Sequence, residues 1–138
     1  MSIKHTMPVQ IRFSDVDQLG HVNNSVYFSL YDLGKTAYFR DVLGEELDFG
    51  GICTVVANVN ANFFTPVYFH DNLAIETTTV QIGNKSFTLL QRAVDVTTQE
   101  VKCECRTVMV CFDRRSKQTV PVPREWRDAI NTYEDKEL

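Results

Sequence analysis

One long run of helical periodicity, residues 24–43, constrains the fold of this chain more than any other feature. Apolar and small residues recur in it every three or four positions, the spacing that places side chains on one face of an α-helix. The stripe consists of Tyr27, Leu30, Tyr31, Gly34 and Tyr38, and Val26, Leu33 and Ala37 widen it. Gly44, a common type of helix terminator, follows the run. We therefore predict one helix from Asn24 to about Leu43, buried over much of its circumference.

The segments on both sides of this helix alternate between apolar and polar residues, as half-buried strands do. Before the helix, the alternation that begins at Val9 predicts a strand reaching about Ser14. After a break at Gly50-Gly51, the alternation at residues 53–64 predicts a second, two-faced strand. Its apolar face consists of Val55, Ala57, Val59, Ala61 and Phe63, and its other face carries mostly amide side chains.

The rest of the chain continues as strands. The turn at residues 82–86 predicts a hairpin of strands 73–82 and 87–96, and a long strand at 101–112 and a short one at 119–120 follow. A short helix is predicted to follow, from Pro123 to about Thr132. This order favours an α+β architecture in which one long helix packs on five or six antiparallel strands. Because such a sheet has edges that invite pairing, we also expect a homodimer or a dimer of dimers.

The composition narrows the classes of function. The chain has 138 residues, a net charge of −4 and a pI near 5.3, whereas nucleic-acid-binding domains normally carry an excess of Lys and Arg. No apolar run reaches the roughly 18 residues of a membrane span, and the first residues lack the basic-then-apolar pattern of a signal peptide. We therefore expect a cytoplasmic protein that binds neither nucleic acid nor a membrane.

The four cysteines give little support to a metal site. Cys53, Cys103, Cys105 and Cys111 lack C-x-x-C spacing and have no histidine close to them in sequence, which argues against zinc. Residues two apart on a strand share a face, so the last three cysteines are expected on one side of the strand at 101–111. We interpret them as reduced, buried and apolar thiols.

The turn before the long helix carries the residues best suited to chemistry. Gly20 relaxes the backbone there, and Asn23 or Asn24 can cap the helix. Asp17 is then expected near the unpaired N–H groups at the helix start, where the helix dipole favours negative charge. An acid beside such donors forms a small site suited to attack on a carbonyl group, with the donors stabilising the oxyanion.

Other residues of this turn have simpler interpretations. Asp15 is one residue from Asp17 and points the other way in an extended turn, so we interpret it as structural, paired with Arg12 or a backbone amide. Asp15, Asp17 and His21 together are few ligands for a divalent metal ion, and no metal is expected. His21 more simply fixes the turn or lines the pocket. Asn23 is either a helix cap or a substrate contact.

Three motifs follow one another along the chain. They are residues 12–24 with Tyr27 in the helix, the segment 62–67 followed by Asp71-Asn72-Leu73, and the turn 83–87. In this order they resemble hotdog-fold acyl-CoA thioesterases of the 4-hydroxybenzoyl-CoA thioesterase type, over nearly the whole chain. The resemblance implies one hotdog thioesterase-like domain over residues 1–138, with a long central helix wrapped by the antiparallel sheet. It also implies a homodimer or homotetramer with shared sites at the subunit interface.

The resemblance further implies roles for single residues. Asp17 corresponds to the catalytic carboxylate, acting as nucleophile or as general base for water, and the backbone N–H of Asn24 to the oxyanion donor. Lys85 and Ser86 would face the phosphates of coenzyme A. The substrate would be an acyl-CoA or an acyl carrier protein thioester, with coenzyme A as part of the substrate and no separate cofactor. Where some family members carry an aromatic or His side chain near the helix start, this chain has Asn23-Asn24.

Two other functions stay open at this point. One is a non-catalytic module that binds an acyl thioester in order to sense or deliver it. The other is an acyl-thioester hydratase or dehydratase on the same fold, which needs a His beside the Asp to move a carbon-bound proton, and only His21 is near.

Tyr27 is interpreted as a core residue whose hydroxyl reaches the edge of the site. Arg114 and Arg115 are read equally as solvated turn residues or as part of a phosphate contact.

Overall fold

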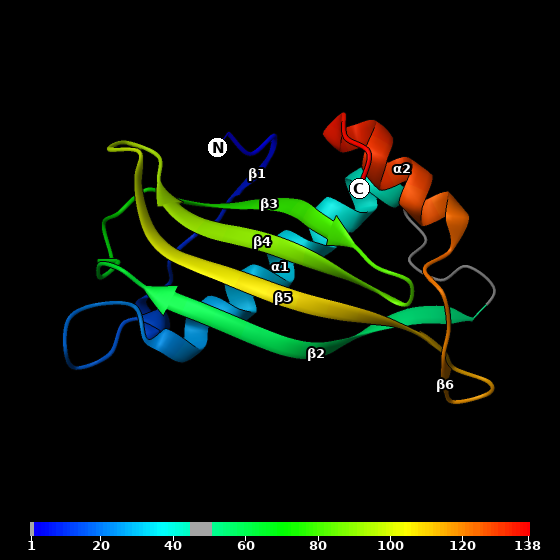
Figure 1. Cartoon of the computed structure of the whole chain (residues 1–138). Helices are drawn as coiled ribbons and strands as arrows, with labels where there is room; N and C mark the ends of the chain where they lie inside the picture. Colours follow the sequence, from blue (N-terminus) through cyan, green and yellow to red (C-terminus); the bar gives the residue numbers. More distant parts are fainter. Residues whose placement is uncertain (1, 45–50) are drawn as a thin grey trace.

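The computed structural model describes residues 2–44 and 51–138, so Gly50, half of the predicted break before the second strand, lies outside the described residues. Figure 1 shows the arrangement of the elements. In chain order they are β1 (His5–Pro8), a 3-10 turn η1 (Phe13–Asp15), α1 (Asn24–Leu43), β2 (Ile52–Phe63), β3 (Leu73–Ile82), β4 (Ser86–Asp95), β5 (Glu100–Asp113), β6 (Gln118–Thr119) and α2 (Arg124–Glu134).

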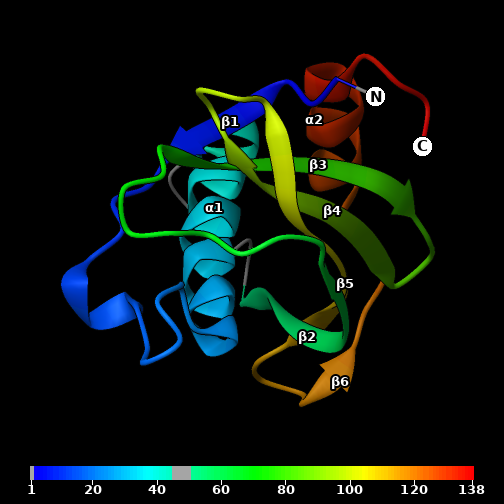
Figure 2. The ribbon, with the colours of Figure 1, turned by 90° about the vertical axis from the view of Figure 1, so that its left-hand side faces the viewer.

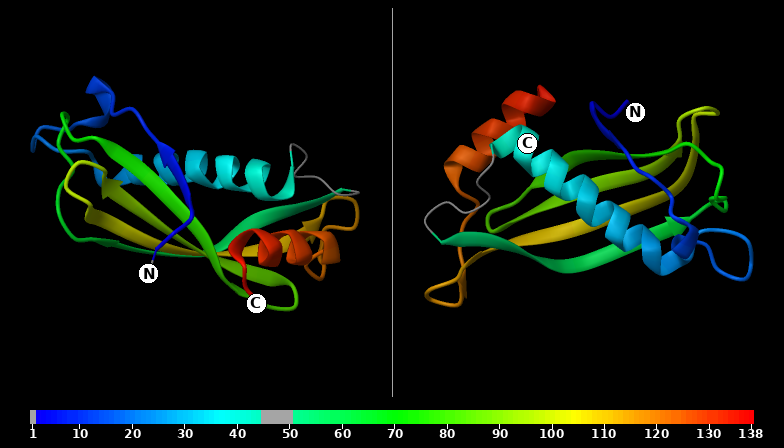
Figure 3. Two further views of the ribbon diagram at one scale, coloured as in Figure 1. Left: turned by 90° about the horizontal axis from the view of Figure 1, so that it is seen from above. Right: turned by 180° about the vertical axis from the view of Figure 1, so that it is seen from behind.

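The strands form one antiparallel sheet in the order β1-β3-β4-β5-β2, and β6 pairs with β5. Helix α1 lies across one face of this sheet, which curves around it (Figure 2), and the view from behind shows the helix running obliquely over the strands (Figure 3, right). Helix α2 lies beside the C-terminal half of α1. The predicted architecture of one long helix on a six-stranded sheet is therefore confirmed.

The bounds of α1 agree with the sequence pattern. Asn23 caps the helix, since its side-chain Oδ1 accepts from the backbone N–H of Ser25 at 2.9 Å. Gly44 ends it at a φ of +93°, a conformation that side chains other than glycine's disfavour. The predicted stripe is buried, but of the residues predicted to widen it only Ala37 is buried, whereas Val26 is half-buried and Leu33 is 56% exposed. Leu33 was wrongly assigned to the core because it lies on the side of α1 that faces the N-terminal segment instead of the sheet.

Two apolar clusters fill the space between α1 and the sheet. The cluster under the first half of the helix includes Tyr27, Leu30 and Tyr31, packed on side chains of β3, β4 and β5. The cluster under the second half includes Tyr38, Phe39 and Trp126 of α2. The predicted inward face of β5 is confirmed, because Cys103, Cys105 and Cys111 are buried and their thiols are free.

The predicted strand from Val9 to Ser14 is wrong. The strand here is β1, which ends at Pro8, although the Val9 N–H still donates to the carbonyl of Leu73 at 3.0 Å. The chain then leaves the sheet and closes the turn η1, in which the Asp15 carboxylate accepts the backbone N–H of Arg12 at 2.8 Å. Phe13, expected on the apolar face, is 88% exposed. A local side-chain hydrogen bond thus replaced the strand that the alternation suggested.

The predicted faces of β2 need one correction. A β-bulge lies between Val56 and Asn58, where two consecutive positions of β5 pair with residues two apart on β2. Val56 therefore pairs with the inward-facing Met109, whereas Val55 pairs with Val110 on the other face. Beyond the bulge the predicted alternation holds. Since β2 is the last strand of the sheet, most of its side chains are exposed on both faces.

Helix α2 protects the opposite edge of the sheet. Strand β1 pairs with β3 only as far as Thr77, so no strand of the described residues lies beside the edge of β3 from Thr78 onward. Glu134, at the end of α2, covers this edge: its Oε2 accepts from the Tyr38 hydroxyl at 2.6 Å, the Thr78 hydroxyl at 2.8 Å and the Thr79 backbone N–H at 3.2 Å. The Glu134 carboxylate thereby connects the edge of the sheet to α1 and α2.

Candidate active site

The turn that precedes α1 is closed by its own backbone. The N–H of Asp17 donates to the carbonyl of His21 at 3.1 Å, and the N–H of Gly20 donates to the carbonyl of Asp17 at 3.0 Å. Gly20 has a φ of +87°, which a residue with a side chain adopts only with strain. A bridge between Val16 and Val22 holds the two sides of the turn together. Asp17 is therefore held within a few residues of the start of α1.

Both oxygens of the Asp17 carboxylate have donors. Oδ1 accepts the backbone N–H of Leu19 at 2.9 Å, and Oδ2 accepts the side-chain N–H of Asn23 at 3.2 Å. The side chain is half-buried and sits at the N-terminal end of the helix. Its contact with Asn23, the cap residue, connects the acid to the helix start.

Asn24 is the first residue of α1, and a helix leaves the N–H groups of its first turn without intrahelical acceptors. The N–H of Asn24 has no acceptor among residues 2–44 and 51–138, whereas the next N–H, of Ser25, is taken by the cap. The helix dipole adds a partial positive charge at the same point. The position is suited to stabilise an oxyanion.

A cavity of about 170 Å³ opens beside the helix start. It contains three of the predicted site residues, His21, Asn24 and Tyr27, while Asp17 and Asn23 are outside its lining. Its other walls come from the end of β2 and the following loop. The lining consists of His21, Val22, Asn24, Tyr27, Phe63, Phe64, Thr65 and Pro66. The Val22 N–H, bound to the carbonyl of Val67 at 2.8 Å, fixes this loop against the helix start.

Phe63, Phe64 and Thr65 were not predicted as site residues. The sequence did contain a signal for this part of the site, because two consecutive aromatic residues stand at the end of the predicted strand. In the structure the first of them, Phe63, is 40% exposed. Periodicity assigned Phe63 correctly to the face of β2 that pairs with the buried Cys103, but at the end of the last strand in the sheet order its ring is only partly covered. Phe63 packs edge-on against the ring of Tyr27, with 5.2 Å between the ring centroids.

The titratable groups beneath the site are held neutral. Burial raises the pKa of Tyr27 to about 12, so its hydroxyl remains protonated at neutral pH. Burial likewise raises the pKa of the Cys103 thiol to about 11, which leaves this thiol unreactive. Since a thiol nucleophile must be a thiolate, the buried cysteines do not compete with Asp17 for the role of nucleophile.

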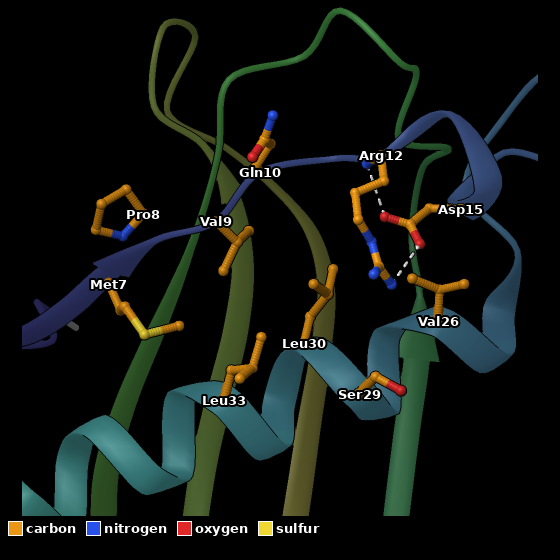
Figure 4. Close-up of a pocket in the computed structure, with 10 residues that line it drawn as sticks. All are labelled: Met7, Pro8, Val9, Gln10, Arg12, Asp15, Val26, Ser29, Leu30 and Leu33. Atoms are coloured by element: carbon orange, nitrogen blue, oxygen red, sulfur yellow. Dashed lines mark hydrogen bonds and ion pairs between the residues drawn. The ribbon is translucent and has the colours of Figure 1, made fainter.

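Asp15 has different binding partners from Asp17. It is 4% exposed, and its carboxylate binds both the backbone N–H of Arg12 at 2.8 Å and the Arg12 guanidinium at 3.4 Å, as its structural interpretation predicted. Figure 4 shows this pair at one end of a second cavity, of about 440 Å³, between the N-terminal segment and α1. Its lining is largely apolar: Met7, Pro8, Val9, Val26, Leu30 and Leu33, with the polar Gln10, Arg12, Asp15 and Ser29.

Lys85 and Ser86 do not lie near Asp17 within one chain. Ser86 pairs with Val110 of β5, whereas Phe63, at the site, pairs with Cys103 of the same strand. Seven residues of an extended strand span roughly 20 Å or more, and Figure 1 shows the β3–β4 hairpin at the opposite end of the sheet from the turn before α1. Lys85 therefore does not contact a group bound at Asp17 within one chain.

A family model for the thioesterase-like superfamily matches residues 11–130. The chain belongs to this superfamily. The superfamily match spans the turn, α1, the whole sheet from β2 to β6 and most of α2. It agrees with the predicted resemblance to 4-hydroxybenzoyl-CoA thioesterases.

Solved structures that share the fold include those of two thioesterases. The PA5185 protein from Pseudomonas aeruginosa strain PAO1 is 28% identical, with a TM-score of 0.84 over 94% of this chain and 91% of that one. A thioesterase from Thermus thermophilus, complexed with coenzyme A and Zn, is 27% identical, with a TM-score of 0.83 over 96% of each chain. Slr0204, a 1,4-dihydroxy-2-naphthoyl-CoA thioesterase from Synechocystis, is 18% identical, with a TM-score of 0.82 over 94% and 96% of the two chains. The chain has the hotdog fold of these thioesterases.

None of the helices in the described ranges is both long and apolar enough to cross a membrane.

Proposed function

We propose that this thioesterase-like protein hydrolyses acyl-CoA thioesters, with Asp17 as the nucleophile or general base and the backbone N–H of Asn24 as the oxyanion donor. The single observation that carries the proposal is the position of the Asp17 carboxylate. It is bound to Asn23, the cap residue of α1, and the backbone N–H of the following residue, Asn24, is unpaired. The coenzyme A bound to the thioesterase from Thermus thermophilus, at 27% identity, supports a coenzyme A ester as the substrate.

Hydrolysis needs few catalytic groups because a thioester is already an activated acyl donor. Asp17 either attacks the carbonyl carbon directly or takes a proton from an attacking water, and negative charge develops on the carbonyl oxygen. An oxygen bound at the N–H of Asn24 is stabilised by that donor and by the helix dipole. One preorganised oxyanion donor contributes roughly 2.7–4 kcal/mol, and a positioned base accelerates a reaction by about 10²–10⁴. The C–S bond then breaks and coenzyme A leaves. After attack by water, the free acid forms directly and the proton held by Asp17 passes to the sulfur; after direct attack, coenzyme A leaves as a thiolate and a water must then hydrolyse the acyl–Asp17 anhydride to regenerate the carboxylate.

The site is completed, in this proposal, by a second copy of the chain. Within the described ranges, no strand pairs with the outer edge of β2, and Val55, Val56 and Val59 are exposed by more than two fifths of their surface. A long apolar edge of this kind favours pairing. If two β2 edges pair antiparallel about a twofold axis, the far end of the partner's sheet lies beside Phe63 of this chain. Lys85 and Ser86 of the partner subunit are then candidates to meet the phosphates of coenzyme A.

Association and activity should therefore be lost together. Val59→Lys introduces a charge from each subunit into such an apolar interface, so we expect the mass in solution to fall from at least twice 15.8 kDa to 15.8 kDa, with loss of turnover. Glu125→Lys, an exposed charge change on α2, is the matched control and should change neither. A wild-type monomer with full activity would refute the shared site.

The release of free thiol from a panel of acyl-CoA esters tests the function itself. The panel should include aromatic, short aliphatic and long aliphatic acyl groups, and the corresponding pantetheine esters. Turnover of at least one coenzyme A ester supports the proposal. Tight binding of these esters without thiol release would instead indicate a binding module, and water addition to an enoyl ester would indicate a hydratase.

A further inference from the structure

We propose that Asn23 is the positioning residue of this site: it fixes the plane of the Asp17 carboxylate relative to the helix start, in addition to capping α1. The inference rests on the proposed function of Asp17. It assigns to one amide side chain two tasks that the sequence presented as alternatives, a helix cap and a contact with the reacting groups.

The two halves of the Asn23 amide have different partners. Its oxygen accepts from the Ser25 backbone N–H at 2.9 Å and from the Ser25 hydroxyl at 2.8 Å, which satisfies the helix start. Its nitrogen donates to Oδ2 of Asp17 at 3.2 Å. Because the amide group is planar, the same side-chain orientation that caps the helix also directs the N–H toward the acid. The backbone N–H of Asn23 is fixed as well, by the carbonyl of Asp15 at 3.0 Å.

Asp17 needs this second contact because one hydrogen bond does not fix a carboxylate. The Leu19 N–H holds Oδ1 at 2.9 Å, but rotation about the bond between Cβ and Cγ of an Asp side chain is soft and would let Oδ2 move. The contact from Asn23 to Oδ2 stops that rotation. The attacking oxygen, or the water that it activates, then keeps a fixed position relative to the Asn24 N–H. Misplacement of a reacting group by about 1 Å can lower a rate roughly 100-fold.

Substitutions at Asn23 separate the two tasks. Asn23→Ser keeps a residue that caps helices as well as Asn does, but its hydroxyl is too short to replace the amide N–H at Asp17. We expect kcat to fall about tenfold or more, with KM within about twofold, because a misplaced acid affects the transition state more than substrate binding. The melting temperature should stay within about 1 °C, since the cap is retained.

Two comparisons accompany this variant. Asn23→Ala removes both tasks, so it should lose activity and also several degrees of melting temperature. Asn131→Ser, the same chemical exchange in α2, far along the chain from the site, is the matched control and should retain wild-type kcat.

The kinetics of purified Asn23→Ser, Asn131→Ser and Asp17→Asn on the best coenzyme A ester test the inference. A lower kcat in Asn23→Ser, at constant KM and melting temperature, supports it. Wild-type kcat in Asn23→Ser together with an inactive Asp17→Asn overturns the role of Asn23 and leaves the proposed function standing. A loss in Asn23→Ser that Asn131→Ser shares, or that a lower melting temperature accompanies, also overturns it. Full turnover of Asp17→Asn overturns the proposed function and this inference together.

Discussion

Glu134 offers the sharpest test of how the fold is held together. Its carboxylate, at the end of α2, is the acceptor for the Tyr38 and Thr78 hydroxyls and for the Thr79 backbone N–H. In Glu134→Ala the Tyr38 hydroxyl keeps its bond with the Thr79 hydroxyl at 2.9 Å, but the other two donors lose their acceptor. Thr78 and Thr79 are buried, so water does not fully replace the carboxylate.

The magnitude follows from these contacts. A hydrogen bond to a charged group contributes about 1.5–3 kcal/mol, and a buried donor left unpaired costs about 1–3 kcal/mol. Because Glu134 itself is only half-buried and the contacts share one oxygen, the terms are not additive. We expect Glu134→Ala to lower the free energy of unfolding by about 2–3 kcal/mol. Glu134→Gln, which keeps the shape and an acceptor oxygen, should cost about 1 kcal/mol.

Urea denaturation followed by circular dichroism measures these differences, with Glu137→Ala as the matched control. Glu137 is an exposed Glu three residues further along, and its removal should change the free energy of unfolding by less than about 0.5 kcal/mol. Equal unfolding midpoints for Glu134→Ala and Glu137→Ala would refute the account of α2 as the cover of the β3 edge.

Two further predictions concern the core. Gly34→Ala should lower the free energy of unfolding by about 1–2 kcal/mol in the same urea assay, because the added Cβ would lie 2.6 Å from Cγ2 of Ile75. The cost of this overpacking exceeds the gain in helix propensity. A more stable variant would contradict this packing. Burial raises the thiol pKa of Cys103 and Cys111 from 9.0 to about 11, so the folded state disfavours their thiolates, and the free energy of unfolding should decline as pH rises from 9 toward 11. At about pH 8 a thiol reagent should modify only Cys53 rapidly in the folded protein, and rapid modification of all four cysteines would contradict the burial.

The sequence was sufficient to predict the elements whose patterns are set by one buried face. Helix α1 was predicted to within a residue because a continuous apolar stripe lies between a capping Asn and a terminating Gly. Strand β5 was predicted because its alternation corresponds to burial on one face, whereas the hairpin β3–β4, which is buried nearly throughout, was predicted from the turn between two runs of strand-forming residues.

The wrong strand predictions lie where a local hydrogen bond or a β-bulge interrupts the alternation of apolar and polar residues. The strand expected up to Ser14 is replaced by the turn that the Asp15 carboxylate closes on Arg12, and no periodicity reports such a hydrogen bond. The bulge in β2 exchanges the faces of Val55 and Val56, because one inserted residue reverses a period of two.

Part of the candidate site was also accessible from the sequence. The spacing from Asp17 to Asn24 predicted an acid at a helix start, and the structure brings Asp17, His21, Asn23, Asn24 and Tyr27 together in that region. The aromatic wall from the end of β2 was missed because it depends on the order of strands in the sheet. The hairpin bearing Lys85 lies at the far end of the sheet from Asp17, so its predicted role stays a prediction.

The kcat of Asp17→Asn, measured as thiol release from an acyl-CoA ester that the wild type hydrolyses, tests the central claim most directly. The substitution keeps the size of the side chain and its acceptor oxygen but removes the charge that attacks or activates water. We expect kcat to fall at least about 100-fold with KM little changed, whereas Asp15→Asn, whose carboxylate binds Arg12, should keep kcat within a few-fold of wild type. Undiminished turnover in Asp17→Asn would contradict the account.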